Sequence, residues 1–154
     1  MTRSGFFDMR DAEPDVAEGW EPRDSGWRRN IYSYPPIGSP DGGAHCTAAD
    51  LVRFIQAVRY RLLLPDDLTD TFLSPQVRHH TTDKETVDYG FGLVFILGDG
   101  AIRSYYKDGM NTGASAIIEH FPALDVDLAI VSSTQDGAWA PRSEITRRLL
   151  ADAE

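Results

Sequence analysis

The feature that most constrains the fold is a stretch from Val87 to Ser133 in which apolar and polar residues alternate. Side chains of a β-strand point to opposite faces in turn, so this alternation predicts strands with one buried face. The connections Gly98-Asp99-Gly100 and Pro122-Ala123-Leu124-Asp125 have the residue types of hairpin turns. We therefore expect three or four adjacent antiparallel strands, at 89–97, 101–106, 114–121 and 126–133.

Helical periodicity precedes and follows these strands. Thr47 and Asp50 have the spacing of a helix N-cap and its partner, and apolar residues at 51, 54, 55, 58 and 62 predict one apolar helix face. A short second helix is expected from Pro65 to before Pro75, so helices occupy 47–73, and a final helix spans 141–151. The order predicts an α+β fold, with the C-terminal helix packed on the sheet.

Residues 1–44 show no sustained periodicity and are rich in Gly, Pro, Asp and Trp. They predict coil, although so long a segment without regular structure is uncommon inside a compact domain. Four aromatic residues suggest contact with an apolar surface: Trp20, Trp27, Tyr32 and Tyr34. Two interpretations stay open. The segment wraps its own domain, or it packs against protein outside these residues.

Length and charge restrict the function classes. A chain of 154 residues predicts one domain, 1–154, and a net charge of −9 argues against nucleic-acid or anionic-membrane partners. No apolar run reaches the ~20 residues of a membrane span, and the polar N-terminus has no signal peptide. For the chain as given this predicts a cytoplasmic location, and for a longer parent protein it predicts nothing. His79-His80 has no third ligand at metal-binding spacing and is expected in a solvated loop.

A charged segment, 105–116, separates two of the expected strands and contains Lys107, one of only two lysines in the chain. Asn-Thr-Gly and Asp-Gly are turn chemistry. One interpretation is a strand connection with an exposed lysine. The other is a site that needs a compact positive charge.

Four stretches occur in the order in which serine β-lactamase-related proteins have similar segments. They are Met1-Thr2-Arg3-Ser4-Gly5-Phe6, Asp15-Val16-Ala17-Glu18-Gly19-Trp20, Gly42-Gly43-Ala44-His45-Cys46-Thr47-Ala48-Ala49-Asp50-Leu51 and Tyr89-Gly90-Phe91-Gly92. Through them the chain resembles the C-terminal part of this superfamily. Its members include class C β-lactamases, penicillin-binding D-alanyl-D-alanine carboxypeptidases and esterases of the same fold. The resemblance implies the C-terminal portion of the β-lactamase/transpeptidase-like fold.

In this resemblance, Lys107-Asp108-Gly109 takes the place of the family's third motif, Lys-Thr-Gly or His-x-Gly, on the strand beside the active site. It implies that Lys107 stabilises a substrate carboxylate or biases the pKa of neighbouring hydrogen-bonding groups, and that Gly109 lets substrate approach the strand. It also implies that the backbone N–H of Met110 is an oxyanion donor. Asp108 and Asn111 are the expected substrate contacts. Asp108 replaces the Thr of β-lactamases, so hydrolysis of antibiotics in particular is not implied, and neither is a metal or cofactor.

The nucleophile of the superfamily is the serine of a Ser-x-x-Lys motif at a helix start, and its second motif is Tyr-x-Asn or Ser-x-Asn. The sequence contains no second motif. Its one Ser-x-x-Lys, from Ser104 to Lys107, is expected on a strand, where residues i and i+3 point to opposite faces. We therefore do not assign Ser104 as a nucleophile. The family has both motifs N-terminal to the segment that Met1 resembles, so we expect a C-terminal fragment that is inactive alone.

Three functions follow, in order of preference. The first is half of a serine hydrolase for an ester, lactam or D-amino-acid peptide, whose N-terminal half is supplied by another chain or lost. The exposed faces of such a half favour self-association or a partner. The second is a non-catalytic module that binds a small molecule or a protein. The third is a complete enzyme with another mechanism, but no carboxylate pair or His-Asp-Ser grouping has a spacing that selects it.

Overall fold

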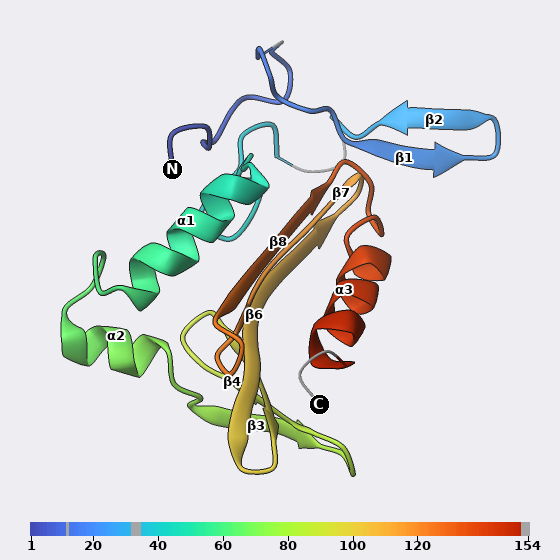
Figure 1. The fold of residues 1–154 in the computed structure, drawn as a ribbon. Helices are drawn as coiled ribbons and strands as arrows, with labels where there is room; N and C mark the ends of the chain where they lie inside the picture. Colours follow the sequence, from blue (N-terminus) through green and yellow to red (C-terminus); the bar gives the residue numbers. More distant parts are fainter. Residues whose placement is uncertain (12, 32–34, 152–154) are drawn as a thin grey trace. The chain divides into compact units, whose positions relative to one another are not determined.

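The computed structural model describes residues 1–11, 13–31 and 35–151 (Figure 1). Tyr32 and Tyr34, two of the aromatic residues expected on an apolar surface, lie outside the described residues. The chain divides into two compact units. The first contains Met1–Asp50, Asp108–Ile117 and Ile130–Glu154, and the second contains Leu51–Lys107 and Ile118–Ala129. The expectation of a single domain stays a prediction.

In the part of the chain that the structure describes, six strands form one antiparallel sheet in the order β3-β4-β5-β6-β7-β8. Their bounds are β3 (Val77–Thr81), β4 (Thr86–Tyr89), β5 (Val94–Gly98), β6 (Ala101–Asn111), β7 (Ala114–Phe121) and β8 (Val126–Ser132). Each strand lies next to its successor in the sequence, and the short connections leave room only for antiparallel turns. The α+β class is confirmed, but the expected three or four strands were too few.

The two hairpins predicted from turn residues are present. Between β5 and β6, Asp99 and Gly100 form a two-residue loop with φ of 54° and 79°. Positive φ at both positions matches the right-handed twist of the flanking strands, and Asp-Gly adopts it readily. Residues 122–125 connect β7 to β8 as expected.

The segment from Val77 to Gly98 differs from the prediction. Residues 77–81, expected in a loop, form β3, and all five are exposed. His79 and His80 therefore lie on a strand. An exposed edge strand needs no apolar alternation, so the periodicity could not reveal it. The expected single strand at 89–97 is split into β4 and β5 by a turn at Gly92, whose φ of 89° is left-handed.

The described residues contain three helices, α1 (Ala48–Arg59), α2 (Asp66–Phe72) and α3 (Trp139–Ala151). They confirm the three predicted segments to within a few residues. In α1, Ile55 and Val58 are buried as expected, whereas Phe54 is exposed and Leu62 lies exposed beyond the helix end. None of the helices among the described residues has the length and apolar character that a membrane-spanning segment requires.

The hydrophobic core of the second unit joins α1 to the sheet strands. Ile55 packs with Leu93, Phe95, Tyr105 and Ile118. Phe95 and Tyr105 form a tilted ring pair with centroids 5.6 Å apart. Burial of such side chains is worth about 1.5–3 kcal/mol each, so this cluster orders the β5–β7 part of the sheet.

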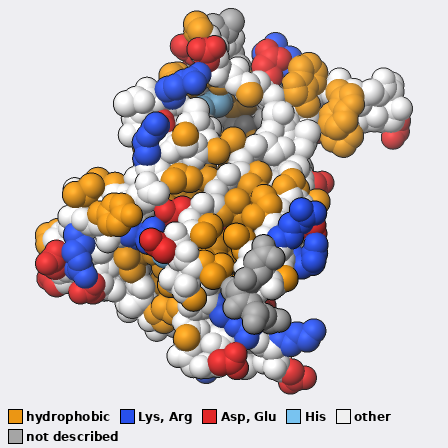
Figure 2. All heavy atoms as spheres, viewed as in Figure 1, with side chains coloured by type: hydrophobic (Ala, Val, Ile, Leu, Met, Phe, Trp, Pro, Cys, Tyr) orange, Lys and Arg blue, Asp and Glu red, His pale blue; other side chains and the backbone are white. Residues whose placement is uncertain are grey.

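The N-terminal segment is not all coil. Strands β1 (Trp20–Arg23) and β2 (Gly26–Arg29) form an antiparallel hairpin that is separate from the large sheet. One face of this hairpin carries both tryptophans; Trp27 is 63% exposed and Trp20 36%. Hydrophobic side chains are visible on its surface in Figure 2. A lone hairpin buries too little surface to be stable by itself. Contacts at its base must therefore hold it in place.

Asp50 fastens the N-terminal segment to the start of α1. Its backbone N–H donates to Thr47 Oγ1 at 3.1 Å, which confirms the predicted N-cap. Its carboxylate, fully buried, accepts hydrogen bonds from the Arg3 backbone N–H at 2.8 Å and from Ser4 Oγ at 2.9 Å. Asp50 thus takes part both in the N-cap of α1 and in a hydrogen bond to Arg3, which is 47 residues away in the sequence.

A buried polar cluster in the second unit centres on Asp127. Its carboxylate accepts hydrogen bonds from Arg59 at 3.0 Å and from Gln56 at 3.0 Å, and lies 2.8 Å from His120 Nδ1. Burial lowers the pKa of His120; Arg59 lowers it further, and the bond to Asp127 offsets only part of this. Burial also raises the pKa of the neighbouring Tyr105 to about 12. Both rings are therefore neutral near pH 7.

We predict that Asp50→Ala lowers the free energy of unfolding by about 1.5–3 kcal/mol. The buried carboxylate accepts two hydrogen bonds, and its loss leaves their donors without this acceptor. Chemical denaturation measures this. Asp24→Ala, at an exposed position in the β1–β2 turn, is the control and should change stability by less than about 0.5 kcal/mol. Equal effects of the two substitutions would contradict this assignment.

We also predict that stability falls as the pH drops from 7 to 5. Because the pKa of His120 is lowered in the folded chain, the unfolded chain takes up this proton first. The contribution is complete above about pH 6.5 and is lost as the pH falls toward the folded-state pKa. If folding lowers the pKa of His120 by one unit, the contribution to the free energy of unfolding is about 1.4 kcal/mol.

The measurement is the free energy of unfolding of wild type and His120→Asn at pH 5, 6 and 7. The variant, whose amide can still donate to Asp127, should lose part of the pH dependence. If wild type and His120→Asn show the same slope, His120 does not control it.

Candidate functional site

The five residues singled out by the sequence, 107–111, form the end of β6. The strand was expected to stop at Tyr106 but continues to Asn111, so these residues lie on the strand and not in a turn. All five are exposed, whereas Ser104 and Tyr105 on the same strand are buried. The register of β5 with β6 begins with Val94 opposite Tyr106. The end of β6 therefore extends past its β5 partner.

The orientation of the Met110 amide follows from the turn. β6 ends at Asn111 and β7 begins at Ala114, so Thr112 and Gly113 form a two-residue hairpin loop. The residues that flank such a loop pair with each other, so the Asn111 amide faces β7. Backbone amides of a strand alternate between its two edges, so the Met110 N–H faces the edge opposite β7. This orientation is compatible with an oxyanion donor, a role that stays a prediction.

Gly109 lies beside open space. A Cβ added there would have no atom within 4 Å, and its φ is not in the left-handed region. Neither the backbone conformation nor packing within the chain therefore requires glycine at this position. A strand glycine with free space on its side allows another molecule to approach the backbone closely.

The turn after the site is held by Asn30. This side chain is only 2% exposed, and its Nδ2 donates to the Thr112 carbonyl at 2.8 Å. Its backbone N–H donates to the Gly19 carbonyl at 3.0 Å and closes the base of the β1–β2 hairpin. A Cβ at Gly19 would lie 2.5 Å from the Gly113 carbonyl oxygen, so the two backbones are in close contact.

The sequence interpretation missed Asn30, which lies in the segment expected to be coil. Its signal is weak, since a polar residue near several glycines is typical of any turn. Only the folded chain brings it to Thr112, 82 residues away. It is a structural support for the site, and nothing indicates contact with a substrate.

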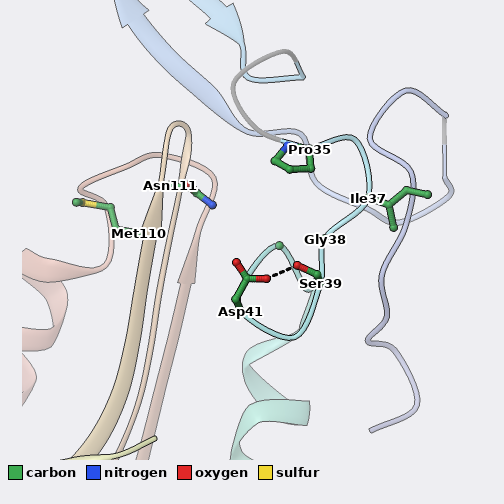
Figure 3. A pocket seen from close by; sticks show the side chains of 9 residues that line it. Pro35, Ile37, Gly38, Ser39, Asp41, Met110 and Asn111 are labelled. Atoms are coloured by element: carbon green, nitrogen blue, oxygen red, sulfur yellow. Dashed lines mark hydrogen bonds between the residues drawn. The ribbon is translucent and has the colours of Figure 1, made fainter.

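A pocket of about 270 Å³ adjoins the end of β6 within the first unit (Figure 3). Met110 and Asn111 line it from the strand, and a loop lines it from the other side with Pro35, Ile37, Gly38, Ser39, Asp41, Gly42 and Gly43. In Figure 3 the Asn111 side chain points towards this loop and the Met110 side chain points away. Of the five predicted site residues, the structure brings these two to the pocket; Lys107, Asp108 and Gly109 precede them on β6.

Ser39 and Asp41 were also missed. The Ser39 hydroxyl donates to Asp41 Oδ1 (Figure 3), and this bond lowers the pKa of the Asp41 carboxyl below its ordinary value. The segment Ser39-Pro40-Asp41-Gly42-Gly43 has the residue types of a turn, and its two final glycines also begin one of the four stretches that resemble the family. No local pattern distinguishes a turn that lines a pocket from any other surface turn.

The serine of the literal Ser-x-x-Lys sequence is buried in the second unit. Ser104 Oγ donates to Glu119 Oε1 at 2.8 Å, and both residues are buried. Ser104 is on a strand, while Lys107 is exposed. These positions agree with the expectation that Ser104 is not the nucleophile. Among the described residues, no three His, Cys, Asp or Glu side chains converge as a metal site would require.

Comparison with known proteins gives a matching family and similar solved structures. A model of the Beta-lactamase family matches residues 1–153. A solved structure, a penicillin binding protein from Bacillus halodurans, superposes with a TM-score of 0.87 at 30% sequence identity. The match covers 96% of this chain and 44% of that protein, so the chain spans less than half of its length. None of the curated proteins compared matches the chain.

The family match extends over nearly the whole chain, so it depends on the strands and helices together and not on one motif. The superposition adds that these elements have the same arrangement as in a penicillin binding protein. Both agree with the resemblance drawn from four short sequence stretches. The chain belongs to the beta-lactamase family.

Proposed function

We propose that these 154 residues form the β6 side of the active site of a serine hydrolase related to β-lactamases and penicillin-binding proteins. The observation that carries the proposal is the exposed end of β6. There a lysine, a glycine beside open space and an edge-facing amide follow in the order of the family's third motif. The substrate class is an ester, a lactam or a D-amino-acid peptide.

Each residue has a chemical task in this proposal. A substrate that lies along β6 can approach closely at Gly109, because no side chain or neighbouring atom occupies that space. The Met110 N–H donates to the carbonyl oxygen and stabilises the negative charge that develops when the carbonyl is attacked. Lys107 binds a substrate carboxylate, and Asp108 and Asn111 make the remaining polar contacts.

The attacking group comes from outside these residues. The sequence has no Tyr-x-Asn or Ser-x-Asn, and the serine of its one Ser-x-x-Lys is buried against Glu119. Binding energy and an oxyanion donor without a nucleophile do not give acyl transfer. We therefore expect the chain to be inactive alone and to depend on a polypeptide that supplies the serine.

Two surface features support such a partner. β8 is the last strand in the sheet order, so one of its edges can pair with a further strand. The β1–β2 hairpin exposes two tryptophans. An N-terminal half of the same fold is the preferred partner, and self-association through these surfaces is the alternative.

A non-catalytic binding module is the second candidate. The pocket beside Asn111 favours it, because a pocket can bind a ligand without any nucleophile. The two candidates differ in one respect: a binding module remains inactive whatever polypeptide is added.

The pure chain should not turn over a chromogenic cephalosporin or a p-nitrophenyl ester. Turnover above that of the Lys107→Ala variant would defeat the claim that the nucleophile is missing.

The DNA upstream of Met1, read in all three frames, should encode Ser-x-x-Lys followed by Tyr-x-Asn. Adding the polypeptide encoded there should restore turnover, and changing its motif serine to alanine should abolish it. An intact complex that stays inactive would favour the binding module.

In the active complex, Gly109→Val should lower turnover at least about tenfold by blocking the substrate. The same substitution should change the free energy of unfolding of the chain by less than about 0.5 kcal/mol, because the added Cβ meets nothing within 4 Å. A loss of stability equal to the loss of turnover would refute the proposed role of this space.

The two lysines of the chain provide a matched pair for the same assay. Lys107→Ala should lower turnover about ten- to hundredfold, as expected for a residue that stabilises bound charge. Lys84→Ala removes the same charge at an exposed position between β3 and β4 and should leave turnover within about twofold of wild type. Similar losses in both would mean that only net charge matters.

A further inference from the structure

The pocket beside Met110 and Asn111 has an uneven lining. Among the nine described residues that line it, Asp41 is the only charged one. Pro35 and Ile37 are apolar, Ser39 and Asn111 are polar, and three glycines expose backbone. A ligand in this pocket therefore meets one negative charge beside polar groups, exposed backbone and a smaller apolar surface.

The loop that carries Asp41 is closed by backbone contacts. Ser39 N–H donates to the Gly42 carbonyl at 2.8 Å, and Gly42 N–H donates to the Ser39 carbonyl at 2.9 Å. Pro40 restricts φ at the first position of the turn between them. At the base of this loop, a Cβ on Gly38 would lie 2.5 Å from the Gly43 carbonyl oxygen. The two backbone segments of the loop are therefore in contact there.

This closure fixes the Asp41 carboxylate in place before any ligand binds. Oδ1 accepts the Ser39 hydroxyl, and the second oxygen points away from Ser39 (Figure 3). The hydroxyl favours the ionised carboxylate by donating to it. A carboxylate that is already ordered and charged loses little entropy when it pairs with a cation.

We propose that this pocket is a subsite for a positively charged substituent of the ligand, an ammonium or amidinium group on a hydrocarbon skeleton, with Asp41 as the residue that selects for charge. The ligand class rests on the proposed function, since the subsite adjoins the strand that would bind the acyl group. Asp41 is then a specificity residue and takes no part in bond breaking.

Other ligands fit the lining less well. An anion would face Asp41 without a cationic partner among the lining residues. A metal ion needs several oxygen, nitrogen or sulfur ligands, and the lining has one carboxylate. A neutral apolar group would leave the carboxylate without a partner from the ligand. An amine next to an apolar group uses both parts of the lining.

The test measures binding to the 154-residue chain alone, so its result does not depend on turnover. Three probes share one ring: benzylamine, benzyl alcohol and benzoate. A cavity of about 150 Å³ holds benzene, so the ring fits a pocket of about 270 Å³. Chemical-shift changes in two-dimensional NMR spectra report both the affinity and the residues affected.

Benzylamine should shift the amides of Ser39, Gly42 and Asn111. It should bind roughly two- to fivefold more tightly than benzyl alcohol, the range expected for a solvent-exposed ion pair. Benzoate should bind most weakly. The preference for the amine should shrink as salt is added, because salt screens exposed charges.

Three variants separate the carboxylate from its surroundings. Asp41→Asn keeps the shape of the side chain and an acceptor for Ser39, and it should abolish the preference for benzylamine. Asp24→Asn removes the same charge from the β1–β2 turn and should leave the preference intact. Ser39→Ala removes the hydroxyl but retains the carboxylate, so most of the preference should remain.

Equal affinity for all three probes would overturn the proposal, and so would shifts confined to residues outside the pocket. Equal losses in Asp41→Asn and Asp24→Asn would replace it with a general effect of net charge. If the preference is found but no partner restores turnover, the subsite stands and the hydrolase function fails. If turnover is restored without the preference, the reverse holds.

Discussion

The structure depends on the register of strand β6. Over eleven residues this strand passes from buried core at Ser104 and Tyr105 to an exposed end at Lys107–Asn111. A shift of one residue would exchange the two faces of the strand and turn the Met110 amide towards β7. The position of the core side chains and the direction of the proposed oxyanion donor are therefore set by the same register.

Two hairpin turns and one long-range hydrogen bond keep that register. Asp99-Gly100 and Thr112-Gly113 close two-residue hairpins at the two ends of β6. Asn30 adds a hydrogen bond to the Thr112 carbonyl from a distant part of the first unit. In the same unit, backbone hydrogen bonds order the loop of Asp41. The proposed site thus consists of exposed side chains on backbone that is closely constrained, which limits the entropy lost on binding.

The predictions that succeeded depended on local chemistry. Turn residues located the hairpins at Asp99-Gly100 and 122–125, Thr47 located the start of α1, and four short stretches indicated the family. Most of the predictions that failed concerned exposed strands. β1, β2, β3 and the end of β6 face solvent on most of their residues, so they lack the apolar alternation by which a strand is recognised. Their pairing partners, not their own composition, make them strands.

The sequence by itself determined the fold class and the hairpin turns, because these depend on residue type and spacing. Its resemblance to the family, and not spacing alone, indicated the segment Lys107–Asn111 as the candidate site. Only the tertiary structure decided that this segment continues β6 with its side chains exposed, that Asn30 holds the adjacent turn, and that Asp41 lines a pocket with Asn111. Those contacts join residues up to 82 positions apart. No local pattern encodes them, since they form only when the chain closes its long loops against the core.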